Sequence, residues 1–189
     1  AGRIRIMGKK STELSVGDGM PGRANVLVTE TVDCGLLGEG IVSSITHARA
    51  NLLTEEACII PRAANVYAML VESKRLRGLN WVDRCAGFDV SLMQQYKTPY
   101  YFPVRLAAFE YAALTAPFEV FRFDFERELI LPAHKQISAP VTRGGTCHAV
   151  VFWFDMHLDE EISISNEPGS TTHWEQAIQC LEHELTVQP

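Results

Sequence analysis

The chain lacks the features of two large classes of protein. It has no basic excess, because 17 Lys and Arg residues stand against 23 Asp and Glu residues, for a formal net charge of −6. Proteins that read nucleic acids normally gather positive charge, so that class is disfavoured. The longest apolar runs, such as residues 149–154, fall far short of the ~20 residues that a membrane-spanning helix needs. We therefore expect no membrane segment and no direct contact with nucleic acid.

Paired cysteines are also missing. The chain has five cysteines, an odd number, and no two of them form a C-x-x-C pair. This pattern predicts reduced thiols in a cytoplasmic protein (or a nuclear one in a eukaryote), with no disulfide framework and no zinc ribbon. Cys147, His148, Asp155 and His157 lie on one expected strand and alternate between its faces, so we expect no metal site there.

What is present is typical of a folded chain, with 47% apolar and 21% charged residues. The sequence changes character near Pro61, which divides it into residues 1–60 and 61–189. In the first part, the β-branched run 25–29 predicts a buried strand of a parallel sheet. Apolar residues at Ile41, Ile45, Ala48 and Leu52 then predict a helix over about 40–53. Strand, loop and helix in this order form half of a βαβ unit.

The second part has the pattern of antiparallel β-structure. Residues 65–72, 118–125 and 147–158 predict strands with no helical crossover between them, which favours a sandwich or a barrel. Residues 74–103 are rich in aromatics and too long for a tight connection, so they predict a protruding arm. Residues 174–185 predict a short helix, because Ala177, Ile178 and Leu181 would share one of its sides. The expected fold class is thus α/β plus β.

Two carboxylates carry the strongest chemical signal. Glu30 and Glu39 lie nine positions apart and bracket a glycine-bearing loop that follows the first predicted strand. Open α/β sheets bind ligands at this end of their strands. If the loop folds back, both carboxylates face one point, which suits a guanidinium because that group donates to two partners at once. The same pair also suits acid/base catalysis or a metal, and two solvated loop glutamates would look alike in sequence.

These residues resemble a known family. The segment from Glu30 to Glu39 resembles the "double-E" loop of the protein arginine methyltransferases. Ile60-Pro61-Arg62-Ala63 is similar to the family's entry into its β-barrel, and residues 87–91 lie where the family carries its dimerisation arm. Residues 163–165 followed by 172–174 are similar to the family's Thr-His-Trp loop. Residues 7–17 and 29–33 look most like the branch that contains family members seven and nine.

The resemblance implies a fold and an activity. Residues 1–60 would be the C-terminal remnant of a Rossmann-like methyltransferase domain, and residues 61–189 an antiparallel β-barrel with an inserted helical arm over about 74–103. The activity would be methyl transfer from S-adenosylmethionine to an arginine nitrogen of a protein or peptide substrate. Glu30 and Glu39 would hold the guanidinium, and His173 and Trp174 would wall its pocket, although Trp174 would also suit a barrel core. The arm would form a homodimer or a pseudo-dimer.

Only the adenine end of a cofactor site is represented. By the resemblance, Lys10 and Ser11 would contact the base, and Ile41 would pack near the methyl group. The alternatives are an ordinary polar turn and a plain helix-core residue. No Gly-x-Gly-x-Gly follows a strand, so the chain resembles an internal piece without the N-terminal half of the cofactor domain. We therefore expect it, when alone, to bind S-adenosylmethionine weakly or not at all. The alternative function is an inactive arginine-peptide-binding or dimerisation module.

Overall fold

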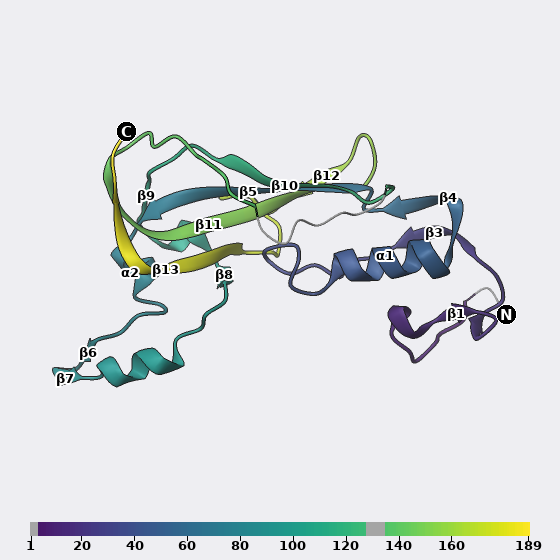
Figure 1. Ribbon diagram of the computed structural model, residues 1–189, viewed down its shortest axis with the longest axis horizontal. Coiled ribbons are helices and arrows are strands. Elements are labelled where there is room, and N and C mark those ends of the chain that lie inside the picture. The colour runs from purple at the N-terminus through teal and green to yellow at the C-terminus, as the bar shows by residue number, and fades with distance from the viewer. Residues whose placement is uncertain (1–3, 128–134) are drawn as a thin grey trace.

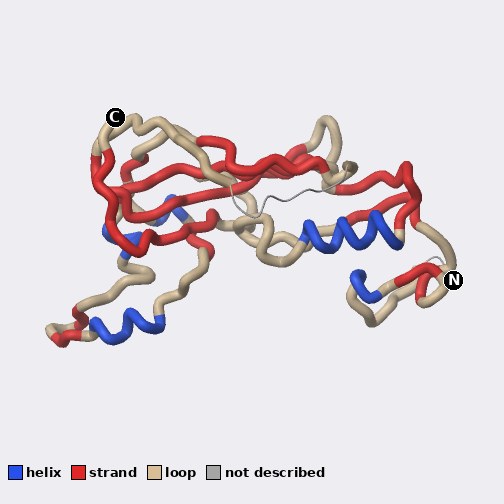
Figure 2. Tube along the Cα trace, in the orientation of Figure 1, coloured by secondary structure: helices blue, strands red, loops and turns tan. Residues whose placement is uncertain are grey.

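The computed structural model of the protein describes residues 4–127 and 135–189. Figures 1 and 2 show an elongated molecule, with a small α/β unit near the N-terminus, a long β-sheet beside it, and a segment that projects from the far end of the sheet. Ahead of the α/β unit come a 3₁₀ turn, Ser11–Glu13, and the short paired strands β1 and β2, Ser15–Val16 and Gly19–Met20. None of the helices in the described ranges is long and apolar enough to cross a membrane.

The α/β unit is a parallel pair of strands connected through a helix. It consists of β3 (Ala24–Val28), α1 (Ile41–Asn51) and β4 (Leu53–Ile60), and β3 pairs in parallel with β4. The predicted helix is confirmed, and its buried side chains are those of the predicted stripe. Gly40 precedes the helix with a φ of 85°, a left-handed conformation that favours glycine. The strand prediction was right in pairing and wrong in burial, since Val26 and Val28 are 49% and 71% exposed.

The larger part is an antiparallel sheet of seven strands. Its hydrogen-bonded path runs in the order β10, β5, β11, β13 and β8, while β12 pairs with β11 and β9 pairs with β5. The predicted antiparallel character is therefore confirmed, as are the three predicted strands β5, β10 and β11. The strands are β5 (Ala63–Glu72), β8 (Phe102–Val104), β9 (Ala112–Ala113), β10 (Phe118–Asp124), β11 (Gly145–His157), β12 (Ser163–Ser165) and β13 (Gln176–Val187).

The helix predicted over residues 174–185 was wrong. The segment forms β13, which lies between β11 and β8 and pairs Val151 with Ile178 and Gly145 with Val187. Its glutamates, glutamines and leucines favour a helix locally, but that preference amounts to a few tenths of a kcal/mol per residue. A strand in this position satisfies the backbone groups of two neighbouring strands at once, so the tertiary pairing prevails.

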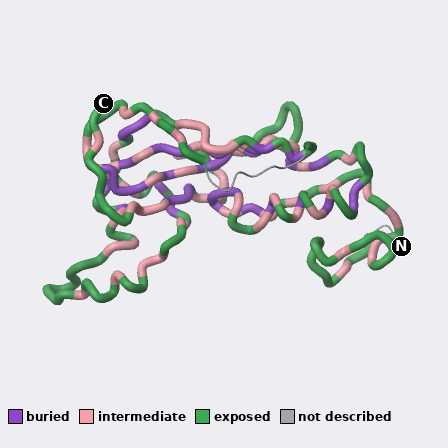
Figure 3. Tube along the Cα trace, in the orientation of Figure 1, coloured by how far each residue is buried: buried purple, intermediate pink, exposed green. Residues whose placement is uncertain are grey.

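The outer part of residues 74–103 projects from the sheet (Figure 1), while Leu76 near their start is buried against it. Residues 74–103 begin with the one-turn helix α2 (Lys74–Arg77) and contain the hairpin of β6 (Arg84–Cys85) and β7 (Phe88–Asp89). A 3₁₀ helix, Ser91–Tyr96, follows the hairpin, and a second one, Leu106–Ala108, follows β8. Figure 3 shows that the outer part of the arm is mostly exposed, and its exposed apolar side chains include Phe88, Leu92, Met93, Tyr96 and Tyr100.

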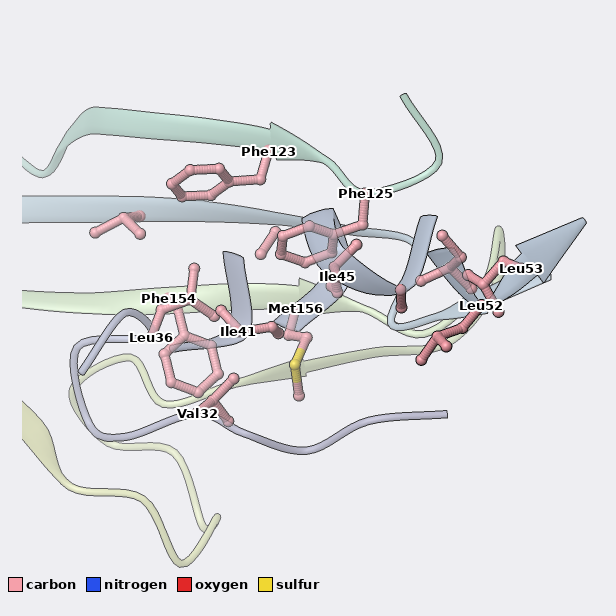
Figure 4. Close-up of a cluster of buried hydrophobic side chains, with 14 residues drawn as sticks. Val32, Leu36, Ile41, Ile45, Leu52, Leu53, Phe123, Phe125, Phe154 and Met156 are labelled. Atoms are coloured by element: carbon pink, nitrogen blue, oxygen red, sulfur yellow. The ribbon is translucent and has the colours of Figure 1, made fainter. Parts of the chain in front are cut away.

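One core joins the two parts of the chain (Figure 4). Ile41 and Ile45 of α1 pack in the same cluster as Phe123 of β10 and Phe154 of β11. Val32 and Leu36 belong to it as well, and both lie in the loop between β3 and α1. The division into residues 1–60 and 61–189 stays a prediction, because this cluster draws side chains from both sides of Pro61.

Candidate functional site

A cavity of about 530 Å³ is lined by the residues predicted to bind the substrate arginine. Glu30 and Glu39 both line it, and so do His173 and Trp174 from the segment before β13. The two glutamates are exposed, as groups that meet a ligand from solution must be. Residues more than 130 positions apart are thus brought to one place. Their roles in catalysis and substrate binding stay predictions, but the expected meeting of the four side chains is a feature of the structure.

The loop between the two glutamates is held by an aspartate. Asp33 Oδ1 accepts hydrogen bonds from the backbone N–H groups of Gly35, at 3.2 Å, and Gly38, at 2.9 Å. The backbone closes a turn in the same place, since the Leu36 N–H donates to the Asp33 carbonyl at 3.0 Å. These three bonds fold the loop back on itself. The folding-back that the sequence analysis required for Glu30 and Glu39 therefore has a local cause.

The same loop is packed too closely for other residues. A Cβ atom added to Gly38 would overlap the Asp33 carboxylate and come within 2.8 Å of the Tyr101 hydroxyl oxygen. At Gly35 a Cβ would come within 2.8 Å of the Phe152 ring. Leu36 has a φ of 76°, unusual for a residue with a side chain, but that side chain is completely buried in the core. Burial of this kind offsets a local backbone strain of ~1–3 kcal/mol.

Aromatic rings form another wall of the cavity. The rings of His173 and Trp174 lie 4.0 Å apart between centroids, and Trp174 packs edge-on against Phe154 at 5.6 Å. The Trp174 indole N–H donates to the Val32 carbonyl at 3.4 Å, which connects this wall to the glutamate loop. Trp174 is therefore partly a core residue and partly a cavity residue, and its role in an arginine pocket stays a prediction.

The cavity is acidic. Asp33 and Glu175 line it together with Glu30 and Glu39, and no Lys or Arg is among the lining residues that the structure describes. Arg105 lies nearby and pairs with Glu175, with 3.5 Å between Nε and Oε1. Four carboxylates around one opening create a negative potential that attracts a cationic group.

Two neutral groups at the cavity are kept from ionising. Burial, with a further contribution from the Asp33 charge, raises the pKa of the Cys34 thiol to about 12. Burial and then the Asp33 carboxylate raise the pKa of Tyr101 above its ordinary value. The thiol and the phenol are both protonated at neutral pH, so neither offers a nucleophile. This leaves the carboxylates as the charged groups of the cavity.

Three residues that line the cavity, Asp33, Tyr101 and Glu175, carried no functional prediction from the sequence. Asp33 lies inside the loop and Glu175 directly follows Trp174, so their nearness to the predicted residues was a usable signal. Tyr101 is different, because it sits at the end of the arm, where no local pattern connects it with the loop. Its ring packs edge-on against Phe152 of β11 at 5.0 Å, and this contact carries it to the cavity.

The predicted cofactor residues lie elsewhere. Ser11 lines a separate cavity of about 280 Å³ between the N-terminal segment, β3 and α1. Lys10 is exposed and directly precedes the 3₁₀ turn that contains Ser11. Ile41 is fully buried in the core cluster and lines neither of the two cavities. Lys10 and Ser11 are neighbours in the chain, but only Ser11 lines the smaller cavity. Ile41 has the helix-core position that was the alternative reading of it.

Comparison with known proteins settles the family. Residues 62–189 match the family model described as the arginine methyltransferase oligomerization subdomain. The chain belongs to the arginine methyltransferase family. Similar proteins include an arginine N(omega)-methyltransferase of Streptomyces achromogenes, 36% identical over 186 residues that make up 98% of this chain and 52% of the relative.

The relatives extend to the branch expected from the sequence. Protein arginine N-methyltransferase 7 of Drosophila yakuba is 35% identical over 88% of this chain and 26% of its own length. Protein arginine N-methyltransferase 9 of Xenopus laevis is 33% identical over 94% of this chain and 25% of its own length. The expected resemblance to members seven and nine is confirmed. The chain spans about a quarter to a half of the length of these relatives.

A solved structure supports the fold. The chain is similar to one chain of the Trypanosoma brucei PRMT1 enzyme-prozyme heterotetrameric complex with AdoHcy, with a TM-score of 0.70 and 18% sequence identity. The match covers 95% of this chain and 57% of the other. At this identity the likeness concerns the arrangement of the backbone.

Proposed function

We propose that the protein to which this chain belongs transfers a methyl group from S-adenosylmethionine to a guanidinium nitrogen of arginine in protein substrates. The observation that carries the proposal is the acidic cavity in which Glu30 and Glu39 meet Trp174. A guanidinium is planar, permanently charged and rich in donors, so it fits between two carboxylates and beside an aromatic face. Membership of the arginine methyltransferase family supports the same assignment.

In this mechanism Glu30 and Glu39 bind and orient the substrate arginine. Bonds from two sides hold the guanidinium plane, so that one nitrogen is aimed at the donated methyl group, and positioning of this kind supplies a large part of a rate enhancement. The two negative charges also draw the positive charge of the guanidinium toward the nitrogens that they contact. Electron density then remains on the attacking nitrogen, which matters because an arginine with a pKa above 12 does not deprotonate beforehand. As the new N–C bond forms, that nitrogen gives up one N–H proton, and Glu30 or Glu39 would accept it.

The chain's own residues fit one end of the methyl donor. S-adenosylmethionine supplies the methyl group when bound. The Ser11 cavity has hydroxyls from Ser11, Thr29 and Ser44 beside apolar side chains such as Leu14 and Val26, which suits a flat base. Lys10 and Ser11 would hold that base. In the complete protein we propose that β3, α1 and β4 finish a Rossmann-like cofactor domain in a cytoplasmic or nuclear enzyme.

The complete protein is expected to methylate arginine and not lysine. The measurement is mass spectrometry of an arginine-containing peptide incubated with the protein and S-adenosylmethionine, with the same peptide carrying lysine as the control. The arginine peptide should gain methyl groups, because the planar guanidinium presents a rigid fork of five donors that binds carboxylates bidentately, whereas a lysine ammonium is a compact point charge. Equal methylation of the two peptides, or none of the arginine peptide, would refute the proposal.

We further propose that the arm, residues 74–103, holds two copies or two halves of the complete protein together. Its apolar side chains are unusually exposed: Leu92 is 84% exposed, Phe88 is 73% exposed and Tyr96 is 75% exposed. Large exposed apolar patches mark protein–protein contacts. The family model that covers this region is described as an oligomerization subdomain, which supports the assignment.

A charge placed in the arm is expected to weaken this association. Leu92→Glu puts a carboxylate into the apolar patch and should raise the dissociation constant at least about tenfold, as judged by sedimentation velocity. Gln95→Glu adds the same charge in the same 3₁₀ helix without removing an apolar side chain, and it should leave the association nearly intact. Equal behaviour of the two variants would argue against the arm as the contact.

A further inference from the structure

We propose that Asn166 is the positioning residue that holds the two walls of the acidic cavity in register, an inference that rests on the proposed function. Asn166 directly follows β12 and is completely buried. It does not line the acidic cavity itself. A buried amide is costly unless its polar atoms are paired.

The side chain of Asn166 connects three segments of the chain. Its Nδ2 donates to the carbonyl of Cys34, at 3.0 Å, and to the carbonyl of Glu175, at 2.7 Å. Its Oδ1 accepts from the N–H of Phe154, at 2.7 Å. Cys34 belongs to the loop that carries Glu30 and Glu39, Glu175 follows His173 and Trp174, and Phe154 belongs to β11. One amide thus ties both cavity walls to the central strand.

The orientation of this amide follows from its partners. Phe154 offers an N–H and requires an oxygen, whereas Cys34 and Glu175 offer carbonyls and require the two hydrogens of an NH₂ group. Rotating the amide by half a turn would place donor against donor and acceptor against acceptor. The backbone around it is also paired, because the Asn166 N–H donates to the Phe154 carbonyl at 3.2 Å and its carbonyl accepts from Gln176 Nε2 at 2.9 Å. The side chain therefore has one orientation.

No other amino acid meets these requirements in the same space. Aspartate has the same shape but places an acceptor against both carbonyls. Glutamine is one methylene longer in a fully buried position, and serine has one hydrogen for two carbonyls. Another direct tie between the walls is the bond from Trp174 to Val32, at 3.4 Å. Loss of the Asn166 amide would remove the two shorter bonds, at 3.0 and 2.7 Å, and leave this longer bond and the apolar packing of Val32 and Trp174.

The first test is hydrogen exchange of the complete protein carrying Asn166→Asp. Amides in residues 33–40 and 167–175 should exchange at least about tenfold faster than in the wild type, while those of β5 stay unchanged. The matched control is Thr115→Val, which removes another buried side-chain bond, from the Leu70 N–H at 3.1 Å, without touching either wall. Faster exchange spread evenly over the sheet, or unchanged exchange in both walls, would overturn the inference.

The second test is kinetic and separates positioning from mere stability. For Asn166→Asp, the KM for an arginine peptide should rise at least about tenfold while the KM for S-adenosylmethionine stays within about twofold. A purely structural residue would lower the amount of active protein and leave both KM values unchanged, as expected for Thr115→Val. Unchanged KM values in an Asn166→Asp protein with reduced activity would refute the inference.

Two further outcomes keep the tests decisive. If Asn166→Asp does not fold, Asn166→Ser serves in its place, because it is neutral and smaller and still cannot donate to both carbonyls. If the wild-type protein methylates no arginine peptide, the proposed function fails, but hydrogen exchange still decides whether Asn166 holds the two walls together.

Discussion

Replacing Glu39 by glutamine in the complete protein is expected to lower kcat/KM for an arginine peptide at least about a hundredfold. Glutamine keeps the size of the side chain but removes the charge that binds and polarises the guanidinium. Glu30→Gln should have an effect of the same order, since the two carboxylates line the same cavity. The measurement is steady-state methylation of a peptide, with calorimetry of S-adenosylmethionine binding beside it.

The binding of S-adenosylmethionine should be unaffected in both variants, because neither glutamate lines the Ser11 cavity. Glu56→Gln makes the same chemical change at an exposed position of β4 outside the cavity, and it should retain full activity. A protein that keeps its activity after both Glu30 and Glu39 have been neutralised would end the assignment of these residues as the arginine clamp.

Replacing Phe154 by alanine is expected to be the most destabilising single change in the shared core. The side chain is completely buried, lies in the cluster that joins α1 to the sheet, and supports the edge of Trp174. Truncation of a buried phenylalanine costs ~3–5 kcal/mol, which combines lost burial with the cavity left behind. Urea unfolding of the complete protein, followed by fluorescence, should show the shift in the midpoint.

The control for this change is Ile162→Ala. Ile162 lies between β11 and β12 and its side chain is 55% exposed, so truncation should cost less than ~0.5 kcal/mol. If Phe154→Ala unfolds at nearly the wild-type urea concentration, the core does not join the two parts of the chain in the way that Figure 4 shows.

Local patterns were sufficient for some elements of the fold. The stripe of Ile41, Ile45 and Ala48 predicted α1, because a period near 3.6 residues has one structural meaning. The long apolar run that becomes β11 predicted a strand because of its β-branched and aromatic residues. The spacing of Glu30 and Glu39 also predicted that both face one ligand, and both line one cavity in the structure.

Other elements depended on distant parts of the chain. The segment of β13 has good helix formers and becomes a strand because β11 and β8 flank it. The role of Leu53–Ile60 as a strand parallel to β3 was missed, since its outward residues are polar and its partner lies some 30 positions earlier. In both cases the deciding hydrogen bonds join residues that no local window contains.

By itself, then, the sequence determined the family, the pair of glutamates, the helix after them and the antiparallel character of the second part. Each of these follows from the spacing of particular residues or from the order of short motifs along the chain. Only the tertiary structure decided that Asp33, Tyr101 and Glu175 share the cavity and that Asn166 ties its walls together. The physical reason is that a buried polar group is specified by partners that the fold delivers from far along the chain, so its role cannot be read from its neighbours in sequence.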